Sequence, residues 1–190
     1  MNEKTKTLIA KRYLGEVLAN DFSDWAVSCI EEGIESKNIL ILASIINPQS
    51  FYEVEDYFRR SLNDLGWKFP NKEDSLFEYA KTIAKQILDK NIDPFEGVTI
   101  IKKIYHALDY PKGLSNWDYI TLWEEEFSDE VLKNAIIREA QNLADFDGTF
   151  DQLREKEFSG PYFEPTVITQ VSNKVRNNES FVSKIWRKIF

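Results

Sequence analysis

The chain has few of the residues that cross-link a small domain or break its helices and strands. Its 190 residues include one cysteine, Cys29, so no intramolecular disulfide can form. It has only 7 glycines and 6 prolines. No apolar run approaches the roughly 18 residues that a membrane-spanning helix needs, and residues 1–6 lack the apolar core of a signal peptide. We therefore expect a cytoplasmic protein whose core is held by packing alone.

Residues for metal binding and acid–base chemistry are equally scarce. His106 is the only histidine, whereas a zinc site or a catalytic triad needs partners of kinds that this chain lacks. We interpret His106 as a solvated surface residue, with general-base chemistry together with Asp109 as the alternative. Cys29 follows Trp25 by one turn on an apolar face, which favours a buried, unreactive thiol over a nucleophile. The sequence thus predicts no cofactor, no metal site and no enzyme.

Positive charge is in the minority. The chain contains 24 Lys and Arg residues and 32 Asp and Glu residues, which gives a formal charge of −8. A field of this sign repels phosphate backbones, so we expect no nucleic-acid binding and favour a basic protein partner. The exception is the segment 166–190, in which five cationic residues accompany one glutamate.

The pattern that is present almost everywhere is helical. Apolar residues recur at i, i+3 and i+4, and no stretch alternates with the period of two that a strand requires. Capping signals begin at Ser50, at Ser75 and at Asp93-Pro94. The class is all-α: about 7–9 helices in antiparallel hairpins stacked side by side, HEAT-like or as an irregular bundle. The expected helices include 4–19, 23–33, 37–46, 116–127 and 128–146.

Composition changes after Gly148. We predict a helical body over 1–148, an irregular surface segment over 149–165, and a basic helical segment over 166–190 that docks on the body to give one compact domain.

In the last segment, residues 180–190 place their aromatic and aliphatic side chains on one half of a helical wheel and their cations on the other. Docking on the chain's own acidic body is the favoured interpretation. A partner's groove and an anionic membrane surface are the alternatives, and we expect no stable membrane attachment.

One short string carries a catalytic motif. Asp145-Phe146-Asp147-Gly148-Thr149 resembles the D-x-D-G-T motif of the haloacid dehalogenase superfamily. The resemblance covers about six residues. It implies a metal-dependent phosphatase or hydrolase in which Asp145 attacks phosphorus, Asp147 acts as acid and base, and the motif ends a buried strand. The preceding residues have a polar, helical pattern instead, so we interpret the string as a helix end with a left-handed stop at Gly148.

The candidate for a binding site is an acidic cluster with aromatic neighbours. Tryptophan and tyrosine are favoured anchors of protein interfaces, although they also fill cores. Our leading hypothesis is a non-catalytic module that presents this surface to a basic protein, as an immunity or antitoxin-type protein would. The candidate residues are Trp117, Tyr119, Trp123, Glu124, Glu125, Glu126 and Asp129.

Overall fold

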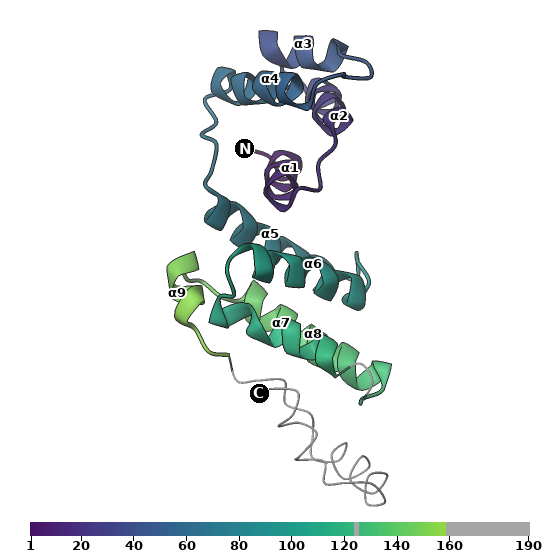
Figure 1. The fold of residues 1–190 in the computed structure, drawn as a ribbon, viewed down its shortest axis with the longest axis vertical. Coiled ribbons are helices and arrows are strands. Elements are labelled where there is room, and N and C mark those ends of the chain that lie inside the picture. Colours follow the sequence, from purple (N-terminus) through teal and green to yellow (C-terminus); the bar gives the residue numbers. More distant parts are fainter. Residues whose placement is uncertain (124–125, 159–190) are drawn as a thin grey trace, which may run out of the picture. The chain divides into compact units, whose positions relative to one another are not determined.

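The protein is all-α. The structure, a computed structural model, describes residues 1–123 and 126–158. These residues form nine α-helices, one 3₁₀ helix (η1) and no strand (Figure 1). The fold class predicted from periodicity is confirmed. The helices are α1 (Glu3–Leu14), α2 (Ala19–Glu31), α3 (Lys37–Ser44), α4 (Phe51–Asp64), α5 (Lys72–Leu88), α6 (Pro94–Ala107), η1 (Lys112–Leu114), α7 (Ser115–Leu122), α8 (Asp129–Ala144) and α9 (Phe150–Glu155).

The chain divides into two compact units. Unit 1 comprises Met1–Ile83 and Lys103–Tyr110, and unit 2 comprises Ala84–Lys102 and the described part of Pro111–Phe190. The proposed segments 1–148, 149–165 and 166–190 stay a prediction, and residues 159–190, which include the whole of the last segment, lie outside the described residues. None of the described helices combines the length and the apolar character that crossing a bilayer requires.

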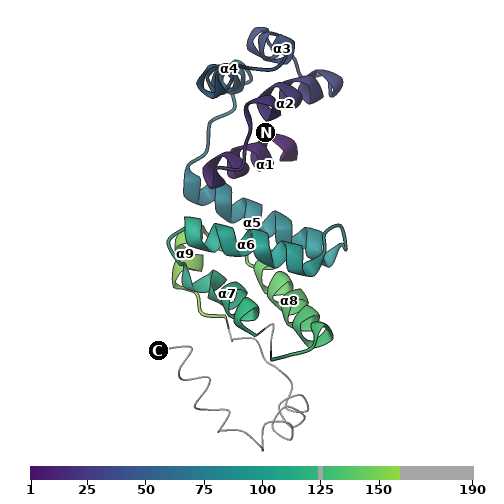
Figure 2. The ribbon, with the colours of Figure 1, turned by 45° about the vertical axis from the view of Figure 1, so that its right-hand side comes forward.

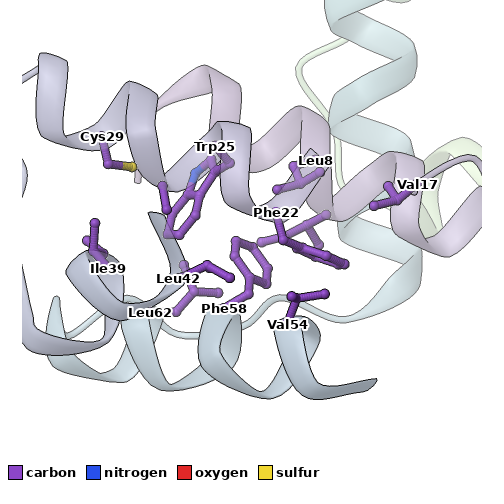
Figure 3. Close-up of a cluster of buried hydrophobic side chains, with 12 residues drawn as sticks. Leu8, Val17, Phe22, Trp25, Cys29, Ile39, Leu42, Val54, Phe58 and Leu62 are labelled. Atoms are coloured by element: carbon purple, nitrogen blue, oxygen red, sulfur yellow. The ribbon is translucent and has the colours of Figure 1, made fainter. Parts of the chain in front are cut away.

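Aromatic rings form the centre of unit 1. The ring of Trp25 on α2 meets the ring of Phe58 on α4 edge to face, with centroids 4.7 Å apart, and Phe22 lies 5.1 Å from Phe58 (Figure 3). Trp25 Nε1 donates a hydrogen bond to Thr5 Oγ1 on α1 at 2.9 Å, so the buried indole N–H is satisfied. Figures 1 and 2 show α2, α3 and α4 side by side around this core.

Two of the three capping signals mark the start of a helix, and the third does not. Ser50 caps α4 by accepting the N–H of Glu53, and Pro94 begins α6, as predicted. The expected cap at Ser75 is wrong: α5 begins at Lys72, because Asn71 Oδ1 accepts the N–H of Asp74 at 2.7 Å. Ser75 lies in the first turn and donates to the Asn71 carbonyl.

The expected boundary between the first two helices is also wrong. Gly15 takes a left-handed conformation with φ 73° and ends α1 at Leu14, although the apolar pattern continues to Leu18. Glycine has no Cβ penalty in this region, which makes it the preferred stop. Asp21 then accepts the N–H of Leu18 and α2 begins at Ala19, four residues before the expected start at Ser23.

A buried carboxylate ties α1 to α4. Glu55 on α4 is buried, and it accepts hydrogen bonds from Arg12 of α1 at 3.1 Å and from Arg59 at 2.9 Å. The two guanidinium groups also lie over the rings of Phe51 and Phe69, respectively. Burial alone would raise the pKa of Glu55, but the hydrogen bonds and charges of the two arginines outweigh it and lower this pKa.

We predict that Glu55→Gln lowers the free energy of unfolding by about 1–2 kcal/mol at neutral pH, since charge-assisted hydrogen bonds to a buried acceptor are lost. Because the folded-state pKa is lowered, the contribution of Glu55 is present above its ordinary value of 4.5 and is lost as the pH falls through the folded-state pKa. The difference between wild type and variant should therefore shrink in acid. Urea unfolding followed by circular dichroism measures it.

The neighbouring Asp56→Asn is the matched control. Asp56 pairs with Arg60 at 2.6 Å on the exposed face of the same helix, where an ion pair contributes less than about 1 kcal/mol. If the two variants lose equal amounts of unfolding free energy, the burial of Glu55 adds nothing to the stabilising effect of its ion pairs.

Candidate partner-binding surface

Helix α7 is fixed on unit 2 by its inward face. Trp117 is only 1% exposed and forms part of the core, so its indole is not available to a partner in this conformation. Lys102 of α6 pairs with Asp118 at 2.9 Å and donates to Thr121 Oγ1 at 2.7 Å. α7 is therefore held from two sides, and side chains on its outward face stand on a rigid support.

A buried polar contact holds α7 against α8. Asn116 Nδ2 donates to Glu139 Oε2 at 3.1 Å, and Glu139 is only 2% exposed. Burial raises the pKa of Glu139 more than the hydrogen bonds of Asn116 and Asn142 and the charge of Arg138 lower it. Sequence reasoning missed this residue, although it falls on the apolar stripe of α8 between Ile136 and Leu143, where an acidic residue signals an unusual environment.

The outward face of α7 carries apolar side chains. Tyr119 and Leu122 are each 42% exposed. They are three residues apart on one helix, so they lie on the same face. A tyrosine beside an aliphatic residue offers apolar contact area together with a hydroxyl group, which is the composition of many interface anchors.

Acidic residues follow in the connection from α7 to α8. The ring of Trp123 packs on that of Phe127 at 5.4 Å and is half-buried. Glu126, Asp129 and Glu130 are exposed. Glu124 and Glu125, the other two candidate residues, lie outside the described residues. We use the name α7 surface for Tyr119, Leu122, Glu126 and Asp129. The structure thus gives Trp117 a core position and Tyr119 a surface position, while their role in binding stays a prediction.

The Asp145–Thr149 string lies in a different context from the one that the resemblance implies. It follows helix α8, which ends at Ala144, and not a strand. Asp145 and Asp147 are both exposed, and Asp145 Oδ2 accepts a hydrogen bond from Gln141 at 2.8 Å. No group of three or more potential metal ligands occurs in residues 1–123 and 126–158.

The expected left-handed stop at Gly148 is wrong. Gly148 is not among the described residues with positive φ, and the C-cap residue of α8 is Asp145, in a right-handed conformation. A Cβ on Gly148 would collide with the ring of Phe146 and lie 2.7 Å from Gln152 Oε1. Close packing explains this glycine. The next residue, Thr149, caps α9 together with Gln152.

The two remaining candidates for chemistry have unremarkable surroundings. His106 is exposed, and the centroid of its ring lies 5.6 Å from that of Tyr105 and 5.4 Å from that of Tyr110. Cys29 is buried, as predicted, and burial together with the charge of Glu32 raises the pKa of its thiol to about 11. The amphipathic segment 180–190 lies outside the described residues, so its three interpretations stay predictions.

No protein-family model, no curated protein and no solved structure shows significant similarity to the chain.

We predict that Cys29 reacts with Ellman's reagent at neutral pH at least about 100-fold more slowly than an exposed thiol. With a pKa of about 11, roughly one thiol in 10⁴ is ionised at neutral pH, and the buried side chain is also shielded from the reagent. The control is Cys29→Ala/Asn20→Cys, with the new thiol at an exposed position of α2. Similar rates for the two proteins would show that Cys29 is accessible and ionised.

We predict that Glu139→Gln raises the free energy of unfolding at neutral pH, because the neutral amide avoids the burial penalty that the charged carboxylate carries. The raised folded-state pKa means that wild-type stability falls as the pH rises above the ordinary value of 4.5. The advantage of the variant should therefore disappear near that pH. Denaturant unfolding over a pH series measures it, with the exposed Glu130→Gln on the same helix as control. A less stable Glu139→Gln at neutral pH would contradict the assignment.

Proposed function

We propose that the chain is a non-catalytic protein-binding module whose α7 surface binds a basic protein. The observation that carries the proposal is the placement of Tyr119 and Leu122, half-exposed on one face of a rigidly held helix and followed directly by exposed carboxylates. An apolar patch of this kind beside charged residues is typical of an interaction site.

Charge supports the choice of partner. The formal charge of −8 attracts a basic protein over a distance of about one Debye length and speeds its association. The carboxylates of Glu126 and Asp129 then face the cations of the partner, while Tyr119 and Leu122 lose water-exposed apolar area on contact. Tyr119 and Leu122 then contribute most of the binding affinity, whereas the acidic residues increase the association rate and the selectivity for a basic partner.

An immunity or antitoxin-type protein is the version of this function that we favour. Such a protein masks a basic partner such as a nuclease, and needs negative charge, a rigid surface and no chemistry of its own. The acidic balance of the chain and the outward face of α7 both fit this role. The product of a neighbouring gene is the first partner to test.

We predict that the tagged chain, purified from its native cells, carries a protein of basic isoelectric point. Recovery of that protein should fall at least about tenfold for Tyr119→Ala/Leu122→Ser, because loss of an interface anchor costs 2 kcal/mol or more. It should also fall for Glu126→Lys/Asp129→Lys, with a larger effect at low salt.

Two variants on unit 1 are the matched controls. Tyr52→Ala removes another exposed tyrosine, and Asp24→Lys/Glu35→Lys makes the same change of charge at exposed positions. Both should leave recovery unchanged. The proposal fails if no basic protein co-purifies, or if the controls reduce recovery as much as the α7 variants do.

A further inference from the structure

A groove with an apolar floor opens in unit 2, where the turn between α5 and α6 faces α8. Its volume is about 550 Å³. Five of its lining residues are aliphatic or proline: Ile87, Leu88, Ile92, Pro94 and Ile137. Ile137 is 44% exposed, so an occupant of the groove would remove a large apolar side chain from water.

The rim of the groove is positively charged, in contrast to the chain as a whole. Lys90 and Lys133 both line it. Among the residues that the structure describes, neither lysine forms an ion pair, and the only ring contact of Lys133 Nζ is with Phe95, 5.7 Å from the ring centroid. The single carboxylate in the lining belongs to Asp93, whose Oδ1 accepts the N–H of Phe95 at 2.9 Å at the start of α6. Two ammonium groups therefore remain available to an anion.

The backbone at this corner holds one of the two lysines in an unusual conformation. Lys90 has φ 59°, in the left-handed region that favours glycine. Its own N–H bonds to the carbonyl of Ile87, and the N–H of Asn91 bonds to that of Gln86. This pattern closes the end of α5 and fixes the direction in which the Lys90 side chain leaves the helix.

The dimensions of the groove favour a compact occupant. Along α8 it extends from Lys133 to Ile137, one helical turn or about 6 Å of axis. This is too short to accept the face of a partner's helix, which needs several turns. The volume lies instead within the range of about 300–1,000 Å³ typical of small-ligand sites.

We propose that this groove binds a small apolar carboxylate of the medium-chain fatty-acid type. The hydrocarbon chain covers Ile87, Ile92 and Ile137, and the carboxylate lies between the ammonium groups of Lys90 and Lys133. The groove shares no residue with the α7 surface, and this proposal does not depend on the function proposed for that surface.

Calorimetric titration of the full chain with decanoate and with decanol tests the proposal. We expect saturable binding of decanoate with one site per chain, and affinity at least about tenfold weaker for the uncharged decanol. Lys90→Gln/Lys133→Gln should weaken decanoate binding to the level of decanol. The control Lys68→Gln/Lys72→Gln removes two exposed lysines of unit 1 and should bind as the wild type does.

A second pair of variants tests the apolar floor. Ile137→Asp places a carboxylate in the groove and should abolish decanoate binding, whereas Ile46→Asp makes the same change at an exposed position of unit 1 and should have no effect. Both side chains are exposed, and circular dichroism verifies that the variants fold. Absence of saturable decanoate binding by the wild type, equal affinity for decanol, or equal losses in the control variants would each overturn the proposal.

Discussion

The contact between Trp25 and Phe58 is the interaction on which unit 1 depends. It joins α2 to α4, and the hydrogen bond from the same indole to Thr5 adds α1. Glu55 lies three residues before Phe58, so the ion pairs with Arg12 and Arg59 act on the same region of α4. With no disulfide possible, the fold is stabilised by this combination of aromatic packing and a fully paired carboxylate, because neither a bare helix nor an unpaired buried charge would be stable alone.

In unit 2, core packing, a buried hydrogen bond and an ion pair hold helix α7 in place. The buried Trp117, the Asn116–Glu139 hydrogen bond and the Lys102–Asp118 ion pair all lie on or beneath α7. These contacts hold α7 in one orientation, so the side chains of Tyr119 and Leu122 remain exposed to solvent. A surface that is ordered before binding loses less conformational entropy when a partner arrives. This is the physical reason for placing a binding function on α7 and not on a flexible loop.

Much of the fold was predictable from periodicity and capping, while the details that depend on tertiary contacts were not. The helical class, the cap at Ser50 and the proline start of α6 follow from local chemistry. The end of α1 at Gly15 was missed because the apolar stripe continues across the glycine, and backbone conformation there overrides the pattern. Within the candidate site, the sequence marked the aromatic residues of α7 but could not separate the buried Trp117 from the exposed Tyr119. That distinction depends on which face of α7 meets α8, and no local signal encodes it.

The proposed function requires a basic protein to contact the outward face of α7. Site-specific incorporation of a photoreactive phenylalanine analogue at Tyr119, followed by irradiation in the native cells, tests for this contact. We expect a covalent adduct with one basic protein at Tyr119 and none when the analogue replaces Tyr52 of unit 1, which is even more exposed than Tyr119. An adduct at Tyr52 with the same protein, or no adduct at Tyr119, would contradict it.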